Sequence, residues 1–345
     1  MESFRIQIRA CVMLILALLP CIASAQRGSY VQIAVGDCHG MVIKKDGTLW
    51  AFGENYRGQL GDGTTKNRRT PVKVLSNVKS VACGDYHTIA ILNDGSLCAC
   101  GWNDFGQLGD GTTTDRHTPV KVLSNVKSVA CGSSYTMAIL NDGSLYAWGN
   151  NVCGQLGDGT TTVRYEPVKV LSNVKSVVCG GFHTMAILND GSLYSWGNND
   201  EGQLGDGTTT DRHTPVKVLS NVKSIACGSH HTMAILNDGS LYAWGRNNDG
   251  RLGDGTNTDK HTPVKVLSNV ISVACGGFHT IAILNDSSLY AWGRNDEGQL
   301  GDGTKTGRLN PLKIEDNVLE VACGAFFTAY ITESGDFKTV GRIYW

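Results

Sequence analysis

Cysteine and histidine recur four residues apart, a spacing that could pair a thiol nucleophile with a general base. The pairs are Cys83 and His87, Cys179 and His183, Cys227 and His231, and Cys275 and His279. A catalytic pair needs one activated thiolate beside one base, so an active site is not expected in every copy of a repeat. The pattern favours a structural role, with cysteine as a small buried apolar residue and histidine bonded to neighbouring backbone.

Histidines at equivalent places in five repeats could in principle surround a metal ion. They are His39, His87, His183, His231 and His279. Tyr135 and Phe327 hold the same place in two other repeats, and no paired cysteine or carboxylate accompanies the histidines. A zinc site needs such ligands at fixed spacing. The sequence therefore predicts no metal site here.

Aspartates in Gly-Asp-Gly-Thr segments are a second recurring candidate for cation binding. They are Asp62, Asp110, Asp158, Asp206, Asp254 and Asp302. A calcium loop needs oxygen ligands at alternating positions and a closing glutamate, and neither pattern is present. We interpret these aspartates as turn formers. The chain also lacks a phosphate-cradling loop ending in Lys-Ser or Lys-Thr and a nucleophile elbow. We therefore predict no enzyme activity and no cofactor.

The composition excludes several classes of protein. Among 345 residues, 41% are hydrophobic and 18% are charged, with 43 glycines and 7 prolines. These values do not fit disorder, collagen or a coiled coil. Lys and Arg total 30 against 31 for Asp and Glu, so no positive field is available to hold a phosphate backbone. Nucleic acid is therefore not expected as a partner.

The N-terminal segment 1–25 has the layout of a secretory signal peptide. Arg5 and Arg9 precede or flank an apolar run over 10–19, and Ala23-Ser24-Ala25 precedes Gln26 as a small-residue cleavage site. The run is too short to cross a bilayer, and no later segment is apolar enough. We predict cleavage near Ala25 and a mature domain over 26–345 that is secreted, periplasmic or at the cell surface. Lipid attachment at Cys21 is disfavoured because Pro20 stands where a small residue is expected.

The elements that position these residues follow from a repeat of constant length. Its evenly spaced anchor glycines are Gly36, Gly84, Gly132, Gly180, Gly228, Gly276 and Gly324. Each repeat has short β-forming runs bounded by Gly, Asn or Asp, which in the second copy cover 78–84, 87–92, 96–101 and 119–123. An Asn-Asp-Gly segment between the second and third runs predicts a tight hairpin. Four antiparallel strands per repeat predict an all-β fold, a seven-bladed β-propeller.

The sequence does not decide which strands complete the last blade of the propeller. Fourth strands are predicted to start at only six places, namely Pro71, Pro119, Pro167, Pro215, Pro263 and Pro311. One blade should therefore have three strands, unless residues 342–345 or residues near Gln26 pair with it. Cys38 and Cys153 fall in variable loops and are the thiols that we expect to be most exposed.

Antiparallel order places the first-to-second and third-to-fourth connections at the same end of each blade. The repeats differ most in these connections, where aromatic residues and arginine accumulate. Such side chains anchor protein interfaces because they bury a large area at modest entropy cost. We predict a monomer that binds a protein through this face. The candidates are Tyr56, Arg57, Tyr86, Trp102, Phe105, Arg116, Tyr135, Arg164, Tyr165, Phe182, His230, Arg246, Phe278, Arg294 and Phe326. The alternative is loop drift, with aromatic residues filling the central channel.

The repeat resembles the regulator of chromosome condensation repeat family. The resemblance is carried by Cys-Gly-x-x-His-Thr, then Asp-Gly-Ser-Leu-Tyr-x-Trp-Gly-x-Asn, then Gly-Gln-Leu-Gly-Asp-Gly with a later Pro-Val, over about 30–345. It implies a propeller, whereas function differs among members. A guanine-nucleotide exchange factor of the family uses an inserted wedge, whereas the repeats here are all equal in length and carry no insertion. An ultraviolet-B photoreceptor carries Gly-Trp-Arg-His-Thr, which is missing here.

A secreted propeller that inhibits β-lactamases is similar in export, in its lack of insertions and in its aromatic loops. Together with the leader and the variable loops, this likeness leads us to predict an exported, non-catalytic scaffold that binds a protein. An exchange-factor-like or cytoskeleton-linked regulator is the alternative.

Overall fold

The computed structural model describes residues 30–342, in which every regular element is a β-strand. The strands form seven antiparallel sheets, six with four strands and the last with three. The fold is a seven-bladed β-propeller, as predicted, and the three-stranded blade contains β25, β26 and β27. The signal peptide predicted over 1–25, the residues near Gln26 and the tail over 343–345 lie outside the described residues.

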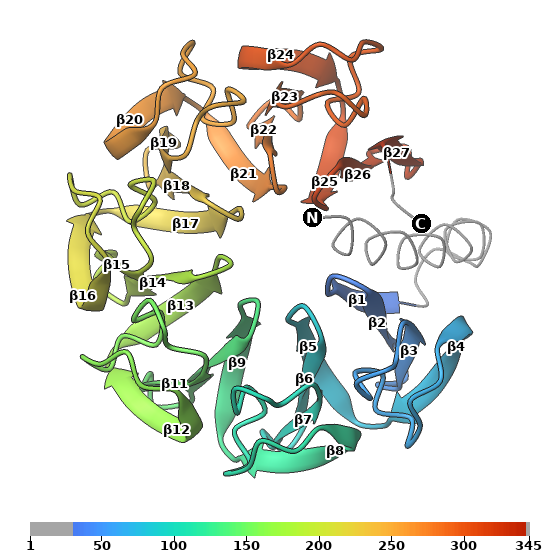
Figure 1. The fold of residues 1–345 in the computed structure, drawn as a ribbon. Coiled ribbons are helices and arrows are strands. Elements are labelled where there is room, and N and C mark those ends of the chain that lie inside the picture. The colour runs from blue at the N-terminus through green and yellow to red at the C-terminus, as the bar shows by residue number, and fades with distance from the viewer. Residues whose placement is uncertain (1–29, 343–345) are drawn as a thin grey trace. The chain divides into compact units, whose positions relative to one another are not determined.

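The chain divides into two compact units, one running to Cys179 and the other beginning at Gly180. The first unit contains β1 to β13 and the second unit contains β14 to β27. Figure 1 labels strands of both units.

Each blade begins with a strand of six residues that precedes the anchor glycine. These first strands are β1 (Tyr30–Val35), β5 (Val78–Cys83), β9 (Val126–Cys131), β13 (Val174–Cys179), β17 (Val222–Cys227), β21 (Val270–Cys275) and β25 (Val318–Cys323). The second strands are the most buried, and they are β2 (His39–Lys44), β6 (His87–Leu92), β10 (Tyr135–Leu140), β14 (His183–Leu188), β18 (His231–Leu236), β22 (His279–Leu284) and β26 (Phe327–Thr332).

The third strands end at a glycine in every blade. They are β3 (Leu49–Gly53), β7 (Leu97–Gly101), β11 (Leu145–Gly149), β15 (Leu193–Gly197), β19 (Leu241–Gly245), β23 (Leu289–Gly293) and β27 (Phe337–Gly341). The fourth strands are β4 (Arg68–Leu75), β8 (Arg116–Leu123), β12 (Arg164–Leu171), β16 (Arg212–Leu219), β20 (Lys260–Leu267) and β24 (Arg308–Glu315). They begin three residues before the prolines at which the sequence predicted them, because Arg116 and its equivalents still pair with the glycine of the third strand.

The hairpin between the second and third strands is confirmed. In the second blade the Gly95 N–H donates to the Leu92 carbonyl at 3.0 Å, and the Asp94 side chain accepts from the Ser96 N–H at 2.8 Å. Gly95 has φ of +81°, a conformation that glycine adopts without a Cβ clash. Ser287 takes this place in the sixth blade with φ of +63°.

Buried histidines link neighbouring blades within each unit. In the first unit His87 Nε2 lies 3.1 Å from Thr136 Oγ1 in the next blade, and Thr136 Oγ1 donates its proton to the Gln107 carbonyl at 2.9 Å. Because the threonine proton is used, the histidine must donate from Nε2. The structural role predicted for histidine is confirmed, but its partner is a threonine hydroxyl rather than backbone.

The anchor glycine is required by the same imidazole. A Cβ at Gly84 would lie 2.1 Å from Cε1 of His87, closer than any real contact. The apolar core lies between blades: one cluster in the first unit joins Ile89 and Leu97 of one blade to Val126 and Trp148 of the next. Rigid packing of this kind fixes the strand ends from which the variable loops start.

Candidate functional site

The two variable connections of each blade meet at one end of the sheet. The N–H of the residue after the third strand donates to the carbonyl of the residue before the second strand. Trp102 donates to Tyr86 at 2.9 Å in the first unit, and Arg294 donates to Phe278 at 3.0 Å in the second. The most variable side chains of a blade therefore leave the backbone from adjacent positions. We call this end of each blade its loop face.

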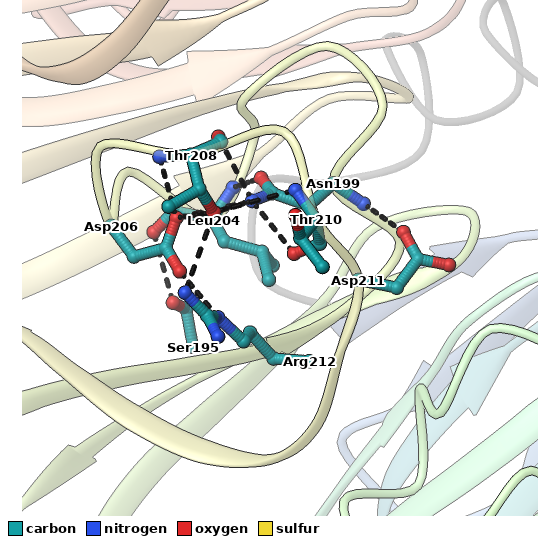
Figure 2. A network of polar contacts seen from close by, with 8 residues as sticks. All are labelled: Ser195, Asn199, Leu204, Asp206, Thr208, Thr210, Asp211 and Arg212. Carbon is teal, nitrogen blue, oxygen red and sulfur yellow. Dashed lines mark hydrogen bonds and ion pairs between the residues drawn. The ribbon is translucent and has the colours of Figure 1, made fainter.

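A buried asparagine organises the long connection between the third and fourth strands. Figure 2 shows the network in the fourth blade. Asn199 Nδ2 donates to Asp206 Oδ1 at 3.1 Å and to the carbonyl groups of Thr208 and Thr210 at 3.0 and 3.1 Å. Asn199 Oδ1 accepts from the Leu204 N–H at 3.0 Å. Asn55, Asn103, Asn151, Asn247 and Asn295 make equivalent bonds, so the loop has the same frame in six blades.

The aspartate of the Gly-Asp-Gly-Thr segment completes this frame. Asp206 Oδ1 accepts from the Thr208 N–H at 3.0 Å, and Asp206 Oδ2 accepts from Arg212 Nε at 2.6 Å. Although burial raises the pKa of Asp206, the bonds from Thr208 and Arg212 bring it below the usual value. The turn-forming role predicted for these aspartates is confirmed.

Two of the candidate interface residues belong to this frame. Arg116 Nε donates to Asp110 Oδ2 at 2.6 Å, and Arg164 Nε donates to Asp158 Oδ2 at 2.6 Å. Both guanidinium groups are partly exposed, but their N–H groups hold the loop of their own blade. The structure thus gives Arg116 and Arg164 a local partner that the sequence analysis did not foresee.

Four aromatic side chains of the first unit form a continuous cluster on the loop face. The ring centroids of Tyr56 and Tyr86 are 5.7 Å apart, those of Tyr86 and Trp102 are 6.0 Å apart, and those of Trp102 and Phe105 are 5.4 Å apart. Tyr56 is 42% exposed and the other three rings are half-buried. We call these four residues the aromatic cluster.

Arg57 lies over the aromatic cluster. Its guanidinium carbon is 5.6 Å from the centroid of the Trp102 ring, within the range of a cation–π contact. Arg57 Nη1 also contacts the carboxylates of Asp104 and Asp115, at 4.0 and 3.3 Å. The cluster therefore already accepts one guanidinium group, whose charge is balanced by these two aspartates.

The second unit presents a different group on its loop face. Phe278 and Phe326 stack with centroids 5.3 Å apart, and Arg294 lies 5.3 Å from the Phe278 ring and 2.7 Å from Asp296. Arg246 contacts Glu201 at 3.4 Å.

Near this group, burial lowers the pKa of half-buried His230, and the positive charges of Arg246 and Arg251 add to the effect. Each of these arginines has an acidic neighbour, which is Glu201 for Arg246, Asp249 for Arg251 and Asp296 for Arg294.

The remaining candidates lie apart from both groups or inside the protein. Tyr165 is 45% exposed and packs over Gly106, where a Cβ would meet its ring at 2.5 Å. Phe182 is 42% exposed. Tyr135 has no exposed surface, because it occupies the buried place that histidine holds in other blades. The prediction that Cys38 is exposed is wrong, because this residue is only 2% exposed.

Sequence reasoning missed the acidic groups beside the aromatic cluster. Glu54 is the first residue after β3, at the place held by Trp102 in the next blade, and it is 9% exposed. Asp37 and Asp85 follow the anchor glycines of the first two blades, and the Asp37 N–H donates to the Asp85 carbonyl at 3.3 Å. Burial raises the pKa of Asp85 to about 7, and the charge of Asp37 contributes. Glu54 could have been noticed as the one acidic residue at a position otherwise filled by Trp, Asn or Arg.

Within residues 30–342, no three His, Cys, Asp or Glu side chains gather in a way that could hold a metal ion. The same range contains no helix with the length and hydropathy needed to cross a bilayer.

Comparison with known proteins matches the chain to models of a single family of propellers. The model of the RCC1-like domain matches residues 16–269, and models of the regulator of chromosome condensation (RCC1) repeat match residues 270–299 and 286–331. Human WBSCR16 is 24% identical with a TM-score of 0.77, covering 89% of this chain and 88% of that one.

Yeast RCC1 (Prp20) in complex with Kap60 is also 24% identical, with a TM-score of 0.76 over 91% of this chain and 80% of its own. Prp20p from Saccharomyces cerevisiae, described with its binding to Gsp1p and histones, is 24% identical with a TM-score of 0.73, over 92% of this chain and 83% of its own. At this identity the likeness concerns the fold.

Proposed function

Because the chain belongs to the family of RCC1-like domains, we propose that it is a non-catalytic scaffold that binds a protein through the loop face of its first unit. The aromatic cluster is the observation that carries this proposal. Its four rings touch in sequence across two blades, and they remain partly exposed. Exposed aromatic groups of this size are characteristic of protein interfaces.

The frame beneath the cluster supports the same function. Asn103 and Asp110 hold the loop that carries Trp102 and Phe105 through bonds of 3.0 to 3.1 Å. A rigid loop loses little conformational entropy when it binds, so its aromatic side chains can contribute most of their buried area to affinity. The partner proposed is a protein because aromatic rings and arginine together suit a large, mixed surface.

Export remains part of the proposal. The leader over 1–25 supports it, and the mature chain would then act outside the cytoplasm. N-terminal sequencing of the protein from its native source tests this directly. A mature start at Gln26 is expected, whereas a chain that retains residues 1–25 would contradict export and favour the exchange-factor-like or cytoskeleton-linked alternative.

Affinity capture tests the binding face. The immobilised full chain should retain a protein from the extracellular fraction, and joint replacement of Tyr86, Trp102 and Phe105 by alanine should weaken that binding at least about 30-fold, as loss of an interface hot spot does. The matched control replaces Tyr146, Tyr194 and Tyr242, three half-buried rings that pair with lysines of fourth strands. Equal capture by both variants and the wild type would overturn the proposal.

A further inference from the structure

Glu54 is a buried acid without a basic partner. Its side chain is 9% exposed, and its Oε2 atom has no hydrogen-bond partner within the described residues. The ion pairs found over 30–342 include none with Glu54. A carboxylate in this position loses its contact with water and gains no compensating charge. We expect such a carboxylate to receive its missing hydrogen bond and counter-charge from a ligand.

The groups around Glu54 are aromatic or acidic. The Cys38 thiol hydrogen-bonds to the Glu54 carboxylate. The charge of Glu54 also acts on the Tyr56 hydroxyl in the aromatic cluster. The hydroxyl groups of Tyr56 and Tyr86 bond to each other. Burial raises the pKa of Glu54, an effect opposed by the hydrogen bond from Cys38. Nothing within this set supplies a positive charge.

Two further acidic groups lie close to Glu54 and the aromatic cluster. Asp37 and Asp85 extend the acidic character beside Tyr86, whose hydroxyl is influenced by the charge of Asp37. The one nearby cation within the described residues, Arg57, is matched by Asp104 and Asp115. A ligand that complements this surface must therefore carry positive charge and tolerate contact with aromatic rings.

Arginine satisfies both requirements better than lysine. A guanidinium group is planar, stacks on aromatic faces, and is more weakly hydrated than an ammonium group. Arg57 on the Trp102 ring is an example of that geometry in this same cluster. We propose that the aromatic cluster holds an arginine side chain of the partner protein, with the Glu54 carboxylate as its counter-charge. This inference rests on the proposed function and specifies the chemistry of the partner.

Short peptides test the inference without the partner. The full chain is titrated with acetyl-Gly-Arg-Gly-amide and with the citrulline analogue, which keeps the shape and lacks the charge, and binding is followed by saturation-transfer NMR. We expect transfer to the arginine peptide and little to the citrulline peptide. Glu54→Asn should weaken binding of the arginine peptide at least about tenfold, because it removes a buried charge partner.

The variants are chosen so that folding does not obscure the result. Asparagine stands at the equivalent place in two other blades, as Asn150 and Asn198, so Glu54→Asn is compatible with the repeat. Glu54→Gln is a second variant that keeps a hydrogen-bond acceptor for Cys38. Glu201→Gln is the matched control, because Glu201 already contacts Arg246 at 3.4 Å. Equal binding of the two peptides, or unchanged arginine binding by both Glu54 variants, would overturn the inference.

The two proposals fail in different ways. If the partner is captured through the aromatic cluster but Glu54→Asn captures it equally well, the arginine inference is wrong and the binding function stands. If the arginine peptide binds at Glu54 but the triple alanine variant still captures the same protein, the proposed binding face is wrong.

Discussion

Mild acid should destabilise this propeller through its buried histidines. Burial lowers the pKa of His87 to about 3 and that of His39 to about 4, because the charged imidazole would lose its water. Burial also lowers the pKa of His183 to about 3 and that of His279 to about 4, and His231 shifts in the same direction. Each of these rings also bonds to a threonine hydroxyl of the next blade. We choose His87→Tyr as the perturbation, since Tyr135 holds the same buried place in the third blade.

The direction in which stability changes with pH depends on whether the folded or the unfolded state binds more protons. Below pH 6.5 the unfolded chain protonates its histidines, whereas folded His87 stays neutral down to a pH of about 3. Stability from this group is therefore complete above pH 6.5 and falls as the pH drops toward 3. The slope is about 1.4 kcal/mol per pH unit, so each histidine removes about 2 kcal/mol between pH 7.5 and 5.0. Partly exposed Asp85 has a raised pKa and acts in the opposite direction over part of this range.

Urea unfolding of the full chain at pH 7.5, 6.5, 5.5 and 5.0 measures the effect. The wild type should lose stability steadily over this range. His87→Tyr should show a smaller loss, by about 2 kcal/mol between the extremes, whatever its stability at pH 7.5. The difference between variant and wild type removes the contribution of Asp85 and the other acids.

The matched control is His117→Gln, at an exposed site on a fourth strand. It removes a histidine from the surface and so controls for the loss of an imidazole as such. The same pH dependence in wild type and His87→Tyr would refute the reasoning, since burial of a neutral imidazole would then have no linkage to folding.

Three further substitutions test the hairpin turn, the loop frame and the core of the repeat. Ser287→Gly should raise the unfolding free energy by about 1 kcal/mol in urea titrations, because φ of +63° suits glycine and strains other residues; a loss would contradict this. Asn103→Ala should lower stability by about 3 kcal/mol, since it leaves the buried Leu108 N–H and loop carbonyls unpaired, and it should also weaken capture of the partner. Normal capture by a folded Asn103→Ala protein would show that the loop frame does not position the aromatic cluster. Trp148→Cys should cost about 3 to 5 kcal/mol by thermal and chemical unfolding, because it removes a fully buried ring and its bond to the Gln107 carbonyl; a change below about 1 kcal/mol would be incompatible with that packing.

Local signals in the sequence account for most of the fold. The even spacing of the anchor glycines, the Asn-Asp-Gly hairpins and the short β-forming runs predicted seven blades, and the six prolines of the fourth strands left one blade with three strands unless a terminal segment completed it. The sheets confirm six blades of four strands and one of three. The beginnings of the fourth strands were less accurate. Their pairing depends on the glycine that ends the third strand, so Arg116 joins the strand before Pro119 does.

The sequence predicted which residues form the candidate site, but it did not predict which of them contact one another. Residue type and variability identified Tyr56, Tyr86, Trp102 and Phe105, and the structure brings these four together. The same reasoning also selected Arg116, which begins a fourth strand at a place held by Arg or Lys in every fourth strand and is bonded to Asp110 within its own loop.

The amino-acid sequence alone determined that this protein is built of repeated small sheets. Periodic glycines and turn residues set the backbone conformation of the few residues around them, which requires no distant partner. Whether a given side chain is exposed, paired or enclosed was decided only in three dimensions. Glu54 illustrates the difference: its burial and its unpartnered oxygen arise from residues of separate loops and strands, and such contacts leave no periodic trace in the sequence.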